Sequence, residues 1–427
     1  MFFGGTDKKT LARCHIYRML WGAKKHVSFH TPGHKIGKYD VTELSFSDNL
    51  SAPTGCIAQA QADIARLLGA NASFLLTDGS TSGVYSMLYA AKAYGVKKIA
   101  APVLSHKSFF HGCELLGLTP VLLENVLENG IPAPLSLEEV EGALAQADAL
   151  FITSPDYYGN IPDLAALQAV CASLQKPFLI DGAHGGHLHF QPTLYAGNYA
   201  DLWVDGVHKS LPALTQGAVV SAKDERFAAP LKEGVERFRT SSPSYPIMAS
   251  VEYAVKYPRN EGLEERVRAF ASTHDALILR EDWTKLLVLS KDAFALQKTL
   301  EKQGIYAEFC DGEVVCFYLS PATTKREFQK LQKALLPYLE TPENREKIDK
   351  NRVHAPVETG NSPIEWVVLA NAEGRICGRS CGLFPPCLPL LIKGEVITKE
   401  KLEKLRNATG VFGLENGKIA VLKGEER

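Results

Sequence analysis

Short apolar runs alternate with segments of helical period between about residue 60 and residue 222. The runs cover residues 73–77, 98–104, 119–123, 149–153, 177–181, 202–205 and 217–221, and segments such as 164–174 repeat their apolar positions with a helical period. This alternation predicts a mostly parallel sheet covered by helices on both faces, an α/β architecture. Ligands of such folds bind beyond the carboxyl ends of the strands.

The pattern changes toward the C-terminus. A polar helical segment is expected at about 248–280, followed by strands at 285–289, 306–309 and 314–318 around a helix near 292–303. A charged helix is expected at 324–339, and a charged stretch without pattern runs to about 362. We therefore expect two domains, an N-terminal segment with a large domain over residues 1–265 and a smaller α+β domain over residues 266–427.

Composition narrows the class of protein. The 427 residues are 45% apolar and 22% charged, with a formal net charge of −1, which implies neither nucleic acid nor an anionic membrane as a partner. No apolar run approaches membrane-spanning length, and the N-terminus is too poor in apolar residues for a signal peptide. The nine cysteines have no C-x-x-C spacing and predict reduced thiols in a cytoplasmic protein. Cys377, Cys381 and Cys387 cluster loosely, and packing is favoured for them over a metal site.

The first chemical signal is a lysine and an aspartate at neighbouring strand ends. The apolar run 202–205 leads into His208 and Lys209, and the run 177–181 ends in Asp181. This combination suits an enzyme of pyridoxal phosphate (PLP), in which the lysine carries the cofactor as a Schiff base and the aspartate pairs with the pyridinium nitrogen.

Two further segments fit the same site, and a third is interpreted as a turn. Residues 77–83 follow a strand and open a helix expected at 84–93, which is typical of a phosphate site or of a simply capped helix; beside Lys209 and Asp181 we favour phosphate. His106 also follows a strand, and its imidazole either lies on the pyridine ring or is a structural, hydrogen-bonded group. Residues 30–34 contain Pro-Gly and predict a turn.

Residues 181–189 contain three histidines. A metal site is not favoured there because no carboxylate supports it at helical spacing. Gly182 and Ala183 fit close approach to a flat cofactor instead.

Together these segments resemble the Orn/Lys/Arg decarboxylases, a family of fold-type I PLP enzymes with an aspartate aminotransferase-like large domain. The matching segments occur in family order and cover nearly the whole chain: 29–35, 78–81, 105–108, 181–184, 208–209 with 213–216, 242–245 and 384–391. The resemblance implies decarboxylation of a basic amino acid to an amine and carbon dioxide.

The resemblance also assigns roles. It makes Lys209 the Schiff-base lysine and Asp181 the pyridinium partner, and it places His106 over the ring. Lys209 or a nearby histidine would return a proton to the substrate. The cofactor-binding set that it implies is Gly79, Ser80, Thr81, His106, Asp181, Ala183, His184, His208, Lys209 and Ser241. The loop at 241–242 would reach the cofactor of a neighbouring subunit, so the resemblance implies a homodimer whose sites are shared across the interface.

The chain departs from the family at several points. Gly206 and Val207 stand where the family often has Ser-Thr, and Cys377-Gly-Arg379 stands where many members have Ser-Ala-Glu. Residues 383–387 and the pair at 48–49 also differ, as does Ser51. Because the family motif begins at Phe29, the sequence leaves no room for the N-terminal wing domain of larger relatives.

Two questions stay open at this stage. Glu43 and Asp48 are candidates to receive a cationic substrate tail, although a solvated surface acid is the favoured interpretation of each. Arg379 could grip a substrate carboxylate, which would favour another PLP reaction such as aminotransfer or β-elimination. A non-catalytic PLP-binding protein is the third alternative.

Overall fold

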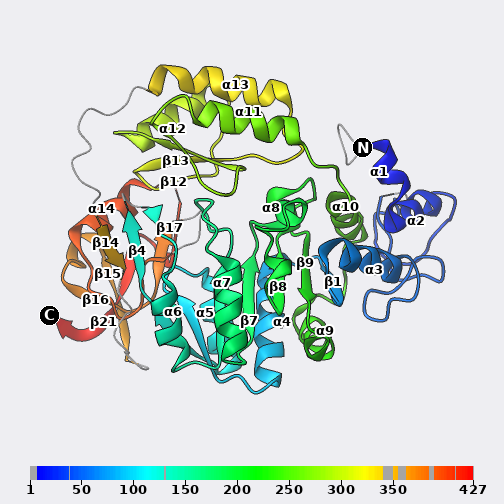
Figure 1. The fold of residues 1–427 in the computed structure, drawn as a ribbon, viewed down its shortest axis with the longest axis horizontal. Helices are drawn as coiled ribbons and strands as arrows, with labels where there is room; N and C mark the ends of the chain where they lie inside the picture. Colours follow the sequence, from blue (N-terminus) through cyan, green and yellow to red (C-terminus); the bar gives the residue numbers. More distant parts are fainter. Residues whose placement is uncertain are drawn as a thin grey trace.

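The computed structural model describes residues 7–37, 39–128, 131–339, 350–353, 362–383, 389–408 and 410–426. Its centre is a seven-stranded sheet in the order β1-β9-β8-β7-β6-β2-β3 (Figure 1). The strands are β1 (Ala72–Leu76), β2 (Lys98–Pro102), β3 (Thr119–Leu123), β6 (Ala149–Thr153), β7 (Phe178–Gly182), β8 (Leu202–Asp205) and β9 (Ala218–Ala222). β9 pairs antiparallel with both neighbours and the other pairs are parallel, so six carboxyl ends share one edge. The predicted mostly parallel α/β sheet is confirmed.

Helices cover both faces of this sheet. One face packs against α3 (Cys56–Leu68), α6 (Leu137–Leu144), α7 (Leu164–Ser173) and α10 (Tyr245–Val255). The other packs against α4 (Ser80–Ala93), α5 (Lys107–Leu116) and α9 (Ala228–Phe238). Successive strand residues point to opposite faces, so Ile180 belongs to the first core and Leu179 to the second. Burial on both faces explains why these strands are continuous apolar runs.

The helical segment expected at 248–280 is two helices, and the single-segment expectation was wrong. α10 ends at Val255 and α11 (Glu261–Ala271) begins after five intervening residues, one of which is Pro258. Proline has no N–H to continue a helix, and the Asn260 side chain accepts from Leu263 N to cap α11. The predicted domain boundary after residue 265 falls inside α11 and stays a prediction.

α11 covers a four-stranded antiparallel sheet in the order β10-β11-β13-β12. These strands are β10 (Leu277–Leu279), β11 (Lys285–Leu289), β12 (Phe309–Cys310) and β13 (Val314–Tyr318), and α12 (Ala293–Lys302) and α13 (Lys325–Leu335) complete the layer. The strand expected at 306–309 is shorter and starts later. This unit has the expected α+β composition.

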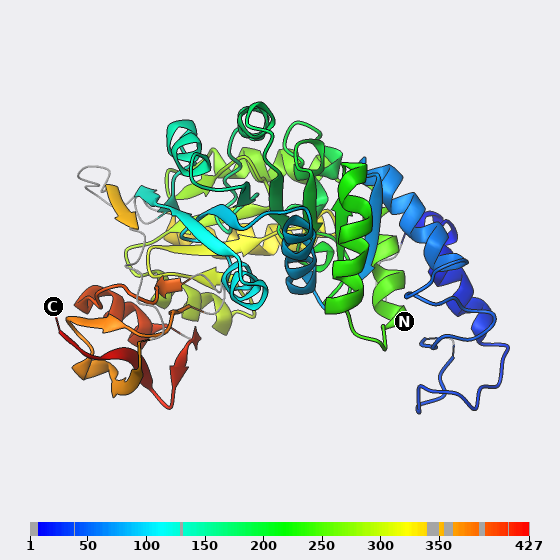
Figure 2. The ribbon, with the colours of Figure 1, turned by 90° about the horizontal axis from the view of Figure 1, so that it is seen from below.

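A further unit with its own core follows. Its elements are β15 (Ile364–Val368), β16 (Arg375–Cys377), β17 (Cys381–Leu383), β18 (Pro389–Leu391), α14 (Lys399–Asn407), β19 (Val411–Phe412), β20 (Leu414–Glu415) and β21 (Lys418–Glu426). Nearby, β14 (Lys350–Val353) pairs with β4 (Asn125–Glu128), which also pairs with β5 (Ile131–Pro132). Figure 2 shows this unit at the opposite end of the molecule from the N-terminal helices.

The N-terminal helices α1 (Lys8–Ala12) and α2 (His15–Ala23) are fastened by a buried ammonium group. Lys256 Nζ on α10's C-terminal side donates to Glu252 at 2.8 Å and to Asp63 at 2.7 Å, and Glu252 also accepts from the N–H groups of His15 and Ile16. His15, Asp63 and Glu252 lie close enough to suggest a metal site, but the ammonium already occupies the space among the carboxylates. The residues 30–34 form the expected exposed turn. None of the described helices is long and apolar enough to cross a membrane.

Candidate active site

Lys209 and Asp181 are brought together by the parallel pairing of β7 and β8. Asp181 pairs with Val204 and Gly182 with Asp205, and Lys209 lies on the short α8 (Val207–Ser210) directly after β8. The two strand ends approach so closely that a Cβ at Gly206 would lie 2.4 Å from the carbonyl oxygen of Ala183. Any side chain at Gly206 would push α8, and with it Lys209, away from the turn after Asp181.

Titratable side chains lie close to the amino group of Lys209. Its Nζ is 3.1 Å from Nε2 of His184 and 5.9 Å from the centre of the Tyr157 ring. Burial and the charge of Lys209 hold the pKa of His184 well below its usual value, so this imidazole is neutral. The neutral ring can accept a hydrogen bond from the lysine.

Asp181 is buried, and burial raises the pKa of its carboxyl group. The charge of Lys209 and a hydrogen bond from Ala183 N, 3.0 Å from Oδ1, act in the opposite direction. A second cation beside this carboxylate would lower its pKa further. The residue therefore suits a protonated pyridine nitrogen as its partner.

His106 forms the N-cap of α5, where its Nδ1 accepts from Ser108 N at 3.2 Å. Burial, together with the charge of Lys209, lowers the pKa of His106 to about 3. A neutral, flat ring close to Lys209 fits stacking on a planar cofactor.

The loop before α4 has the form of a phosphate site. α4 begins at Ser80, four residues earlier than expected, because Gly79 at its N-cap has φ 77° and lets the chain turn directly into the helix. No side chain caps this helix, which leaves the N–H groups of its first turn and the hydroxyls of Ser80 and Thr81 available to an anion.

The loop that follows Lys209 ties this turn to His208. The carbonyl oxygen of Gln216 accepts from Gly79 N at 2.9 Å, and that of Gly217 lies 2.9 Å from Nδ1 of His208. The predicted phosphate contacts therefore come together at the edge that carries Lys209.

Buried polar atoms without a hydrogen-bond partner gather at this edge. Buried polar atoms in proteins are nearly always paired, so such a cluster fits a polar group that binds here. They follow or end β1, β6, β7 and β8, and they are Thr77 Oγ1, Thr153 Oγ1, Ser154 Oγ, His184 Nδ1, Asp205 Oδ1 and Ser210 Oγ. The donors and acceptors present thus fit a phosphorylated pyridine cofactor.

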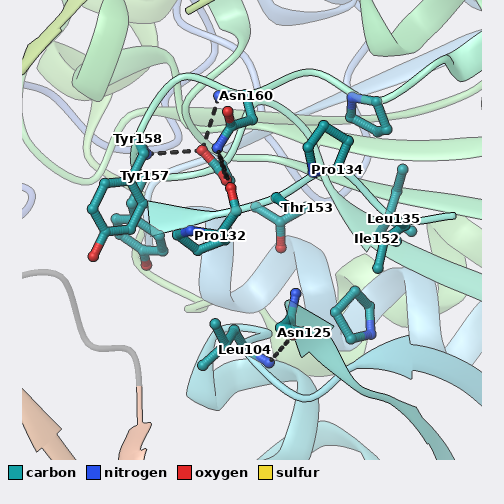
Figure 3. Close-up of a pocket in the computed structure, with 14 residues that line it drawn as sticks. Leu104, Asn125, Pro132, Pro134, Leu135, Ile152, Thr153, Tyr157, Tyr158 and Asn160 are labelled. Carbon is teal, nitrogen blue, oxygen red and sulfur yellow. Dashed lines mark hydrogen bonds between the residues drawn. The ribbon is translucent and has the colours of Figure 1, made fainter. Parts of the chain in front are cut away.

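A small cavity lies behind Tyr157 (Figure 3). Its volume of about 60 Å³ is too small for an amino acid, and the Thr153 side chain lies on its wall together with Asn125 and Asn160. We regard it as a space for water beside the site.

The three histidines of 181–189 have different partners. His184 contacts Lys209, Nε2 of His187 lies 2.9 Å from Asp282, and Nδ1 of His189 lies 2.7 Å from the Gly186 carbonyl oxygen. They do not converge on one point.

Several sequence candidates lie elsewhere. The Asp48 carboxylate accepts from four backbone N–H groups, which lower its pKa although burial alone would raise it. Glu43 accepts from its neighbour Thr42. Arg379 is 61% exposed and pairs with Glu415 at 3.5 Å, with neither of these acids. Residues 384–388 of the C-terminal motif, Cys387 included, lie outside the described residues.

Ser241 is exposed in the single chain. Its neighbour Thr240 donates its N–H to Asp78 at 3.2 Å, so this loop lies against the phosphate loop of the same chain. Contact with a second subunit stays a prediction.

The sequence analysis missed three groups. Tyr157 stacks near His184, with ring centres 4.6 Å apart, and follows a strand that ends in the uninformative Thr153-Ser154. Glu308 comes from the small sheet, and the charges of Lys209 and Lys285 oppose the rise in its pKa on burial. Its electrostatic interaction with Lys209 depends on packing between two units, so the sequence carries no local signal of it.

Asp205 is the third missed group. It is buried, and its Oδ2 accepts from Tyr195 at 2.7 Å and Trp203 at 3.0 Å. Burial and the nearby Asp181 raise its pKa to about 7 despite those two bonds.

A mostly parallel sheet with a lysine and an aspartate at neighbouring carboxyl ends, beside an open helix N-terminus, defines a fold-type I PLP enzyme. Residues 33–288 match the family described as Orn/Lys/Arg decarboxylase, major domain, and the chain belongs to that family. PLP is therefore the cofactor that family membership and fold assign to it.

Similar proteins agree with this assignment. An uncharacterized protein of Bacillus subtilis (strain 168), YaaO, is 29% identical over 88% of this chain and 90% of its own length. An arginine decarboxylase of the same organism is 26% identical over 91% of this chain and 92% of its own. Among solved structures, constitutive lysine decarboxylase of E. coli shares the fold, with a TM-score of 0.74 and 20% identity over 96% of this chain and 82% of that one.

We expect borohydride to fix the cofactor on Lys209, because a lysine–cofactor imine is reducible. Peptide mapping after reduction identifies the labelled residue, and a label on another lysine would show that the role of Lys209 is misassigned.

Asp181→Ala should keep PLP bound through the phosphate loop and Lys209, yet its turnover should fall about a hundredfold or more. Steady-state kinetics measure this effect, and near-normal turnover would show that the role of Asp181 is misassigned.

Asp205→Asn should change how stability depends on pH. The folded chain holds a proton on Asp205 up to about pH 7, whereas the ordinary value is 3.8, so this group's stabilisation is present at low pH and lost as the pH rises between the two values. The asparagine variant should therefore gain on wild type by up to about 4 kcal/mol from pH 4 to pH 8. Denaturation midpoints across this range measure it, and Glu313→Gln, at an exposed carboxylate, serves as the control. A constant difference between Asp205→Asn and wild type would contradict the prediction.

Proposed function

We propose that the protein is a PLP-dependent lyase that decarboxylates a basic amino acid, arginine, lysine or ornithine, to an amine and carbon dioxide. The observation that carries the proposal is the position of Lys209 directly after β8, next to the end of β7 that holds Asp181, with its Nζ 3.1 Å from His184. The charge of Lys209 also acts on the pKa of His106 and of Glu308. Asp181 and His106 suit the cofactor, and Glu308 suits a cationic substrate.

When bound, PLP supplies an electron sink for the bond that breaks at the substrate Cα. Asp181 would hold a proton on the pyridine nitrogen and so favour charge that develops in the transition state. His106 would lie flat on the ring. Lys209, released by the substrate, would return a proton to Cα, with His184 at 3.1 Å able to exchange a proton with it.

Glu308 is the best described candidate to receive the substrate's cationic tail. Its side chain keeps an exposed surface in the single chain, yet the protein around it raises its pKa, and the nearest opposing charges are Lys209 and Lys285. A guanidinium or ammonium group here would gain a charge-assisted hydrogen bond. Glu43 and Asp48 are less suitable because their carboxylates bond to neighbouring residues.

The rival reactions receive less support. Aminotransfer would need an arginine for the substrate carboxylate, and Arg379 is exposed and paired with Glu415.

The packing around Gly206 and Val207 explains why these residues replace the family's Ser-Thr pair. Gly206 fits because no side chain clears Ala183, and Val207 is buried in the core instead of facing a ligand.

Incubation of the PLP-loaded protein with arginine, lysine and ornithine should yield the matching amine and carbon dioxide from at least one of them. Glu308→Gln should raise KM for that substrate about ten- to a hundredfold, since a hydrogen bond to a charged group is lost. Its matched control is Glu313→Gln on the same hairpin, which should leave KM unchanged. A keto acid as product would exclude decarboxylation, and an unchanged KM in Glu308→Gln would exclude its role.

We further propose that the protein is a cytoplasmic homodimer with shared sites. The eight cysteines among the described residues are all unpaired, as in a reducing compartment. Val27 and Phe29 are 87% and 95% exposed, and the loop at Ser241 is open, which supports a second subunit as their cover.

Light scattering should therefore give at least the mass of a dimer. Mixing inactive Lys209→Ala with an inactive Ser241→Tyr variant should restore activity, because one site of each mixed dimer receives both intact residues. Random exchange would give about a quarter of wild-type activity. An active monomer would contradict the dimer, and a dimer without restored activity would contradict the shared site.

A further inference from the structure

A buried ion pair lies outside the cofactor-binding sheet but in contact with the site. Lys285, the first residue of β11, is 1% exposed, and its Nζ donates to Asp282 at 2.8 Å, to Thr284 Oγ1 at 2.9 Å and to the carbonyl oxygen of His184 at 3.3 Å. All three hydrogens of the ammonium are thus used. One of them reaches across to the turn that follows Asp181.

Asp282 is the other half of this pair and has no exposed surface. Its Oδ1 accepts from Thr284 N and lies 2.9 Å from Nε2 of His187, while its backbone N–H donates to Gly159. Burial alone would raise the pKa of Asp282, but the charges of His187 and Lys285 hold it well below the usual range. Asp282 therefore stays ionised, and its pair with Lys285 joins the small sheet to two loops of the large one.

His184 alone separates the pair of Asp282 and Lys285 from the amino group of Lys209. The centre of the Tyr318 ring lies 4.5 Å from Lys285 Nζ and 5.4 Å from the centre of the His184 ring, and the centre of the Tyr157 ring lies 4.6 Å from that of His184. His184 is thus bonded at its carbonyl oxygen to Lys285 and contacts the rings of Tyr157 and Tyr318, with its Nε2 3.1 Å from Lys209 Nζ.

We propose that Asp282 and Lys285 are positioning residues for the reaction at Lys209, acting through His184 and through their opposed charges. The inference rests on the proposed role of Lys209 as the cofactor-bearing lysine. Burying two charges is costly and a hydrophobic pair would often be as stable, so stability alone gives no reason for them here.

Other charged or titratable groups also face Lys209, and any effect of the pair adds to theirs. They belong to four elements around the amine: Asp181 in β7 with His184 just after it, His106 before α5, His208 on α8, and Glu308 before β12. The test must therefore change the pair alone and leave these groups in place.

The experiment is a pH titration of the absorbance of the PLP-loaded protein. Lys285→Met removes a cation, so the protonated, cationic form of the lysine–cofactor chromophore should gain stability and its pKa should rise. Asp282→Asn removes an anion, and the pKa should fall. Each shift should be about half a unit or more for charges this close in a buried site. The double variant should return toward the wild-type pKa but keep a lower kcat, because His184 has lost its anchor.

The matched control is Lys256→Met, which breaks a different buried lysine–carboxylate pair, the one that fastens the N-terminal helices. It should lower the denaturation midpoint as Lys285→Met does, and leave the chromophore's pKa and kcat unchanged. If a single variant does not fold, the double variant still decides the matter, since it buries no unpaired charge.

Shifts of the same sign in the two single variants, no shift in either, or full kcat in the double variant would overturn the inference. These outcomes differ from failure of the proposed function. A wild-type protein that shows no titrating chromophore, or that borohydride labels elsewhere than Lys209, overturns both.

Discussion

The close approach of β7 and β8 at their carboxyl ends is the constraint on which the site depends. Parallel pairing brings Asp181 and the start of α8 to the same level, and the absence of a side chain at Gly206 lets the two turns touch. The buried carboxylate and the partly exposed ammonium group then share one edge of the sheet, where the core on both faces limits the water that screens their attraction.

Burial also explains the protonation states of the side chains around Lys209. Burial keeps His184 and His106 neutral and raises the pKa of Asp181, Asp205 and Glu308. Neutral rings can stack and accept hydrogen bonds without repelling the lysine. Carboxylates with raised pKa respond strongly to an added cation, which is how a pyridinium ring or a basic substrate would be held. One physical cause thus prepares the site for both partners.

The sheet and the core of the site were predictable because their signals are local. Buried strands are apolar runs, and Asp181, His106 and Lys209 follow such runs directly, so a parallel sheet collects them at one edge. Pro258 indicates the end of a helix, but the helical pattern on both sides of it led us to expect one continuous segment. Glu308 and Lys285 could not be placed from sequence, because they reach the site only through packing of the small sheet against the large one. Arg379 was expected near the substrate because the sequence does not reveal its partner. That partner, Glu415, lies 36 residues further along the chain.

The reversed direction of β9 has a consequence for how the cofactor is captured. Because β9 runs against β8, the chain returns from Lys209 into the sheet by a short connection, without a crossover helix. The reactive amine is therefore bracketed by two strands of the central core, and the same connection supplies the carbonyl oxygens that hold Gly79 and His208. These hydrogen bonds are internal to the protein and restrict the loops around Lys209. A ligand that binds to loops restricted in this way loses less conformational entropy on binding, so more of its interaction free energy is retained as affinity.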